Sequence, residues 1–196
     1  MTPPAPASNR DRSAEGRGTG PTPSQTVGPF YGYALPFPGG GDLAPAGAPD
    51  AITVHGRVRD GAGDAVPDAL LEFWQADPAG NLAGAPGSLR RDPVTGAVMG
   101  RNGVDFTGFG RVATDADGHW ALRTLPPGNG HISVCVFARG LLHHLFTRVY
   151  LAHDPFLDTL PADRGRTLLA EREREGVYRF DIHLQGEKET VFLDFG

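Results

Sequence analysis

Hydrophobic and polar residues alternate along several short stretches of this chain, which is the pattern of β-strands that are buried on one face. Ile52–Arg59 alternates in this way, and His131–Phe137 is an apolar run that contains Ser133. Clusters of Gly, Pro and Asp separate the stretches and indicate turns. The pattern predicts about eight strands, at residues 52–59, 69–75, 110–114, 120–125, 131–137, 147–151, 178–184 and 190–193.

Short strands that are separated by Gly- and Pro-rich turns are typical of a β-sandwich. The 28 Gly and 18 Pro among 196 residues disfavour long helices. Residues 165–175 end in alternating Glu and Arg from Glu171 to Glu175, and we interpret this segment as a helix that is supported by charge pairs. We therefore expect a mainly β fold, a sandwich of about eight strands with long loops and one short helix.

The first 50 residues differ from the rest in composition. Residues 1–20 contain no Leu, Ile, Val or aromatic residue, and they are predicted to form a disordered tail. Residues 21–50 are interpreted as an extended docking segment, with four aromatic residues between 22 and 37, followed by a linker at 39–50. Residues 51–196 then form the β-sandwich domain. Residues 77–107 show little regular pattern, and we expect this loop and the docking segment to form an interface.

Charge and cysteine content narrow the functional classes. The net charge is −5 and no Lys/Arg cluster occurs, so no nucleic-acid partner is expected. No apolar run approaches the roughly 18 residues of a membrane span, and the N-terminus has no apolar core of a secretory signal. The single cysteine, Cys135, cannot form a disulfide within the chain, so we predict a cytoplasmic protein and a buried core thiol.

One short sequence suggests an incomplete metal site. A His-x-His pair on a strand can hold a catalytic metal, because alternate residues point to the same face. Here the second position is occupied by Ser133, and His131 alone cannot hold a catalytic iron. The adjacent His143 and His144 should point to opposite faces, and they are interpreted as surface or interface residues. The chain thus looks built around a site that a partner completes.

Five motifs in a fixed order identify a family resemblance. They are Trp74-Gln-Ala-Asp77, Phe106-Thr-Gly-Phe-Gly-Arg111, Thr114-Asp-Ala-Asp-Gly118, Leu125-Pro-Pro-Gly128 and His131-Ile-Ser133. Together they resemble the intradiol ring-cleaving dioxygenases, from about residue 22 to the C-terminus. The resemblance implies a β-sandwich in a family that uses a non-haem ferric iron held by two tyrosines and two histidines.

The resemblance also implies that the ligand set is missing from this chain. Leu82 occupies one tyrosine position, and no tyrosine follows the turn at Pro126-Pro127-Gly128. The two histidine positions hold His131 and Ser133, and the arginine expected before the first histidine is absent. Leucine cannot replace a phenolate and serine is a poor ligand for ferric iron. We therefore expect no metal and no catalytic residue in this chain alone.

Within the family the chain resembles the iron-free α-type subunits, through residues 22–30 and Phe137-Ala-Arg-Gly140. That resemblance implies an iron-binding β-type partner subunit with non-haem Fe³⁺, a higher hetero-oligomer of α/β protomers and a small aromatic acid as substrate. The pocket residues that it implies in this chain are Thr26, Gly28, Pro29, Phe30 and Arg139. Phe30 is commonly a tyrosine in this motif.

Two alternatives remain open at this point. The first is a metal-free β-sandwich that serves as a binding module for a carbohydrate or a protein. The second is a self-sufficient dioxygenase with unexpected ligands, drawn from Tyr31, Tyr33, His143 and His183. Bound iron in the purified single chain distinguishes the second alternative from the others.

Overall fold

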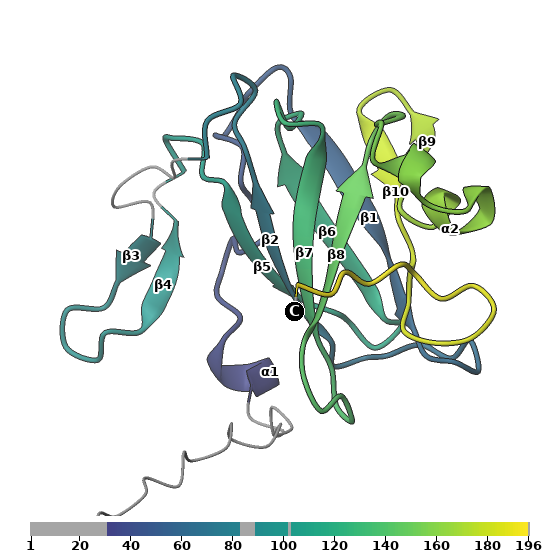
Figure 1. Ribbon diagram of the computed structural model, residues 1–196. Helices are drawn as coiled ribbons and strands as arrows, with labels where there is room; N and C mark the ends of the chain where they lie inside the picture. Colours follow the sequence, from purple (N-terminus) through teal and green to yellow (C-terminus); the bar gives the residue numbers. More distant parts are fainter. Residues whose placement is uncertain (1–30, 83–88, 102, 196) are drawn as a thin grey trace, which may run out of the picture.

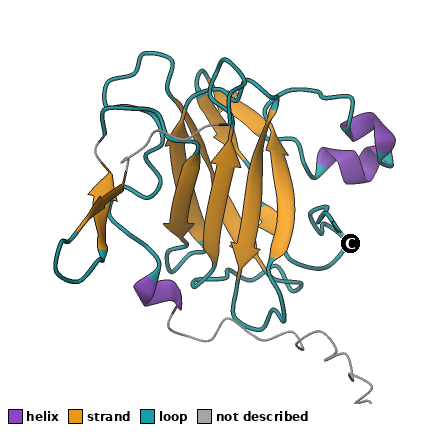
Figure 2. Cartoon of the chain, turned by 60° about the vertical axis from the view of Figure 1, so that its left-hand side comes forward, coloured by secondary structure: helices purple, strands orange, loops and turns teal. Residues whose placement is uncertain are grey.

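The computed structural model describes residues 31–82, 89–101 and 103–195. Two β-sheets pack face to face (Figures 1 and 2). One sheet has the antiparallel order β5 (Phe109–Ala113), β2 (Leu70–Gln75), β7 (His131–Phe137) and β8 (Leu145–Tyr150). The other contains β6 (His119–Thr124), β1 (Ile52–Arg59), β10 (Val177–Arg179), β9 (Glu171–Arg174) and β11 (Ile182–His183), with β1 at its centre. A mainly β sandwich is thus confirmed.

The remaining elements are short. A separate hairpin of β3 (Leu89–Arg91) and β4 (Val98–Arg101) stands beside the sandwich, on the left in Figure 1. Helix α1 is Tyr31–Ala34, a 3₁₀ turn is Leu157–Thr159, and α2 is Ala162–Arg166. In the described part of the chain, no helix is long and apolar enough to cross a membrane.

The core lies between the two sheets and follows the alternation that the sequence predicts. In β7 the side chains of Ile132, Val134 and Val136 are buried, while the residues between them face outward. Phe73 of β2 and Trp120 of β6 meet across the two sheets, with ring centroids 5.1 Å apart. Aromatic pairs of this kind add about 0.5–1.5 kcal/mol beyond the burial of their area.

Glycine at position 56 allows the chain to cross closely over the centre of β1. The backbone N–H of Phe180 donates to the carbonyl oxygen of His55 at 2.7 Å, and a Cβ atom at Gly56 would overlap the Phe180 carbonyl oxygen. This crossing separates β10 from β11, so the single strand predicted at residues 178–184 is in fact two. Phe180 is buried between them and anchors the crossing to the core.

Several sequence predictions need correction. The helix predicted at 165–175 is wrong beyond Arg166, because Glu171–Arg174 forms the exposed strand β9, where alternating charges face solvent on both sides. Residues 190–193 make an isolated bridge from Leu193 to Phe146 instead of a strand. The loop at 77–107 contains the β3–β4 hairpin, and the described residues hold eleven strands instead of about eight.

Residues 31–44 pack on their own sandwich. Tyr31, Phe37 and Leu43 are buried, and Leu43 belongs to the main core. Backbone carbonyl groups of Gly40 and Gly41 accept hydrogen bonds from strands β5 and β6. The linker predicted at 39–50 therefore begins as an integral part of the fold.

The close crossing at Gly56 yields a stability prediction. Gly56→Ala should lower the free energy of unfolding by about 1–3 kcal/mol, because the added methyl group must displace the backbone at Phe180. Gly32→Ala in α1 is the matched control, since a Cβ there meets no atom within 4 Å. Urea denaturation followed by tryptophan fluorescence measures both variants. Equal midpoints for Gly56→Ala and the parent protein would contradict the close crossing.

Cys135 lies on the outward face of β7 and is only partly buried, so the prediction of a core thiol is wrong, and its environment yields a second testable prediction. Burial first, and then the nearby Glu72 carboxylate, raise the pKa of the thiol to about 12. At pH 8 the reactive thiolate should therefore be scarce, and iodoacetamide should alkylate the folded chain at least about 100-fold more slowly than the chain in guanidinium. The slow reaction should accelerate as the pH rises toward 12. Equal rates for folded and unfolded chain at pH 8 would rule out this environment.

Candidate functional site

The outer face of β7 carries the two positions that the sequence compares with histidine ligands. Ser133 lies opposite Trp74 on β2 and Arg148 on β8, and His131 lies opposite Tyr150. Because Ile132 and Val134 enter the core, His131 and Ser133 share the outward face. The structure thus brings them to one surface, as the alternation predicts.

The environment of His131 favours a neutral ring. Burial lowers the pKa of the imidazole, and the Arg148 guanidinium lowers it further, while a hydrogen bond with the Asn129 backbone and the Asp154 carboxylate oppose the shift. The ring also packs against Tyr150, with centroids 5.6 Å apart. These contacts agree with a partly buried, hydrogen-bonded strand histidine.

The residues at the ligand-equivalent positions do not fit a ferric ion. Leu82 is 68% exposed and has no donor atom, and the Ser133 hydroxyl is a weak donor for Fe³⁺. Across the described ranges, no group of three or more His, Cys, Asp or Glu side chains could hold a metal ion. No chemical step through iron is therefore assigned to this chain's own residues.

An aromatic surface surrounds these positions on the same sheet. Trp74 is 50% exposed and packs on Phe109, with ring centroids 5.2 Å apart. Trp74 therefore lies at the surface, whereas Trp120 belongs to the core. Beside the pair, Arg111 lies over the Phe109 ring and forms an ion pair with Glu72.

Arg139, which follows β7, is held by a carboxylate that the sequence did not single out. Its Nε donates to Oδ2 of Asp68 at 2.6 Å, and its side chain is 75% exposed against 28% for Asp68. The Tyr31 hydroxyl donates to the Asp68 carbonyl oxygen, and burial, followed by the Asp68 charge, raises the pKa of Tyr31. The Arg139 guanidinium is therefore held in a fixed orientation and faces solvent, which suits recognition of an anion.

The other predicted pocket residues cannot be placed. Thr26, Gly28, Pro29 and Phe30 lie outside the described residues. Tyr31, which follows Phe30 directly in the sequence, contacts Asp68 beside Arg139. Asp68 was missed because it precedes β2 in an ordinary turn sequence, and its partners are 37 and 71 residues away along the chain.

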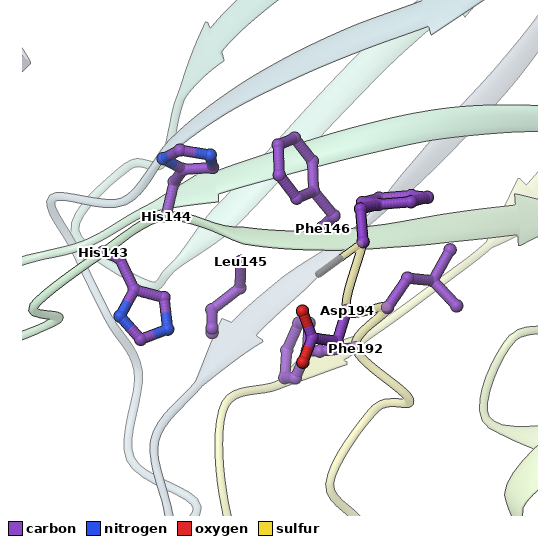
Figure 3. Close-up of a pocket in the computed structure, with 8 residues that line it drawn as sticks. His143, His144, Leu145, Phe146, Phe192 and Asp194 are labelled. Atoms are coloured by element: carbon purple, nitrogen blue, oxygen red, sulfur yellow. The ribbon is translucent and has the colours of Figure 1, made fainter. Parts of the chain in front are cut away.

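His143 and His144 line a cavity of about 410 Å³ with the C-terminal segment. Figure 3 shows their rings on different sides of the chain, and the His144 ring meets Phe146 edge-on at 4.6 Å. Tyr31 lies beside Asp68, whereas His183 lines a groove with Arg59. The described side chains that the self-sufficient alternative would need as iron ligands are therefore not gathered into one site.

Comparison with known proteins agrees with the fold and the motifs. The family described as "Dioxygenase" matches residues 40–131. The protocatechuate 3,4-dioxygenase α chain of Burkholderia cepacia is 41% identical over 88% of this chain and 96% of its own length. The β chain from the same organism is 31% identical over 72% of this chain and 67% of its own length.

A solved structure shows the same architecture. The dioxygenase domain of a dioxygenase carbohydrate-binding protein fusion from Streptomyces sp. SirexAA-E superposes with a TM-score of 0.54 and 28% identity, covering 85% of this chain and 99% of that domain. Together with the identity to the α chain over nearly the whole sequence, this places the chain in the intradiol dioxygenase family.

Proposed function

We propose that this chain is the iron-free α-type subunit of a protocatechuate 3,4-dioxygenase. The observation that carries the proposal is the ligand-equivalent surface, where Leu82 and Ser133 replace donors in a chain that is 41% identical to an α chain. Its match to a β chain is weaker, at 31%. The ferric ion is assigned to a β-type partner subunit, and the two chains together form the active site.

The assembled enzyme would cleave protocatechuate with O₂ between its two hydroxyl-bearing carbons and release 3-carboxy-cis,cis-muconate. This reaction belongs to the β-ketoadipate pathway of aromatic catabolism. The iron-bearing partner supplies the oxygen chemistry, and this chain supplies part of the cavity wall and keeps water out. Thr26, Gly28, Pro29 and Phe30 are proposed to contribute to that wall.

Arg139 is the described residue best suited to the substrate's charge. Its guanidinium is oriented by Asp68 and remains largely exposed, and the planar arginine group matches the geometry of a carboxylate. Asp68 offsets part of the positive charge, which leaves Arg139 able to bind a monoanion and to release the product. We assign the benzoate carboxylate of protocatechuate to this residue.

The aromatic ring pairs at the surface support a stable interface with another subunit. Trp74 and Phe109 on one side of the outer sheet face, and Phe146 with Phe195 on the other, form ring pairs at the surface. Aromatic residues are enriched in the buried centres of protein interfaces. We propose that such surfaces join α/β protomers in a higher hetero-oligomer, in a cytoplasm whose reducing conditions suit the free Cys135.

The subunit assignment predicts where iron and activity will be found. The purified chain alone should be colourless, without stoichiometric iron and without protocatechuate-dependent O₂ uptake. Co-expression with a β-type dioxygenase chain from its own genome should yield a coloured, iron-containing and active complex. Iron and activity in the single chain would overturn the proposal, and a stable chain that never joins a β-type partner would favour a binding module.

The role of Arg139 is tested in that complex. Arg139→Gln should raise the KM for protocatechuate about tenfold, the size of one lost charge-assisted hydrogen bond, with unchanged iron content. Catechol, which lacks the carboxylate, should be turned over equally by the variant and the parent enzyme. Arg172→Gln on exposed β9 removes the same charge elsewhere and serves as the control. An unchanged KM in Arg139→Gln would remove Arg139 from the substrate pocket.

A further inference from the structure

Another cavity, lined mainly by cationic side chains, lies between the β3–β4 hairpin and the segment that follows α1. Its volume is about 580 Å³, within the range of small-molecule sites. The charged side chains that line it are Arg90, Arg101, Arg123 and Asp42. In Figure 1 the hairpin and this segment lie side by side at the edge of the sandwich, and the hydrogen bonds of Arg101 join them.

Arg101 at the end of β4 is held by backbone carbonyl groups. Its Nε donates to the Gly39 oxygen at 3.0 Å, and its Nη2 donates to the oxygens of Gly40 and Phe109. Its Nη1 is buried and has no hydrogen-bond partner among the described residues. The guanidinium also lies over the Phe37 ring, 5.5 Å from its centroid. Carbonyl groups satisfy donors, but they do not cancel a full positive charge.

Arg123 on β6 is held in the same manner. Its Nη1 donates to the Ala44 oxygen at 2.9 Å, and both terminal nitrogens donate to the Pro45 oxygen at 3.2 Å. Within the described ranges, neither Arg101 nor Arg123 lies at ion-pair distance from a carboxylate. Arg111 and Arg139, by contrast, each have one.

The charges that line the cavity therefore do not balance. Three arginines and one aspartate leave a net charge of about +2. Burial lowers the pKa of Arg101 to about 10, although the Asp42 carboxylate opposes this shift, so the group stays charged at neutral pH while it is partly deprived of water. An anion in the cavity would offset that loss of hydration.

We propose that this cavity is a binding site for an anionic ligand that presents two or more carboxylate groups. The three guanidinium groups match carboxylates, and the net charge favours a di- or trianion over a monoanion. Met99 and Ala44 add apolar contacts for a carbon skeleton. The inference does not depend on the proposed function.

Two sources can provide this chemistry, a free polycarboxylate or acidic side chains of a partner chain. Citrate is the probe, measured by titration calorimetry on the full-length chain and on its complex with the β-type partner. Benzoate tests the preference over a monocarboxylate, and inorganic phosphate tests the preference for carboxylates. Saturable citrate binding that weakens with salt, and that exceeds binding of both other anions, is the expected result.

Two substitutions with opposite expected effects on citrate affinity distinguish this site from a general effect of the protein's charge. Arg90→Gln should weaken citrate binding about tenfold, the size of one lost charge-assisted contact, and its exposed side chain makes a folding defect unexpected. Asp42→Asn should tighten binding, because it removes the one acidic side chain among the described residues that line the cavity. Arg172→Gln on β9 removes a positive charge that does not line the cavity and should leave binding unchanged.

The outcomes decide between the two sources. Citrate binding by both the chain and the complex supports a free anion. Citrate binding by the chain alone, together with weaker subunit association in Arg90→Gln, supports acidic side chains of the partner in the same site. No saturable binding in either preparation, or equal effects of Arg90→Gln and Arg172→Gln, overturns the carboxylate site.

Discussion

The two-residue alternation along β7 is the constraint on which the rest of the structure depends. Ile132, Val134 and Val136 must enter the core for the two sheets to pack, so His131, Ser133 and Cys135 must face outward. A shift of one residue in register would bury the polar set and expose the apolar set. The outward position of His131 and Ser133 is therefore a consequence of core packing and does not depend on a bound metal.

This arrangement separates the residues that stabilise the sandwich from those at the ligand-equivalent positions. The core cluster unites the inner faces of both sheets, and the ligand-equivalent side chains of Leu82 and Ser133 are not part of it. Because neither side chain packs in the core, core packing places little constraint on the residue types at these two positions. The same surface can serve association, because Trp74 is exposed beside Ser133 and packs on the partly buried Phe109.

The sequence predicts strand bounds best where the two-residue alternation of buried and exposed positions alone decides the structure. Strands β1 and β7 begin and end where their alternation predicts, because one face of each is buried throughout. The alternating Glu and Arg of β9 fit an exposed strand and a helix equally well, and only pairing with β10 decides between them. Asp68, which orients Arg139, and the carbonyl groups that hold Arg101 come from distant segments, so no local pattern reveals them.

Four arginines of this chain form two physical classes, and the difference bears on function. Arg111 and Arg139 are paired with carboxylates, so their charge is largely offset and their geometry is the useful property. Arg101 and Arg123 are oriented by peptide carbonyl groups, which accept from several of their N–H groups while the positive charge remains. In Arg139, whose side chain is 75% exposed, the pairing fixes the orientation of the guanidinium, which suits recognition of a monoanion. The second class generates positive potential over a cavity, which is useful only when something of opposite charge enters it.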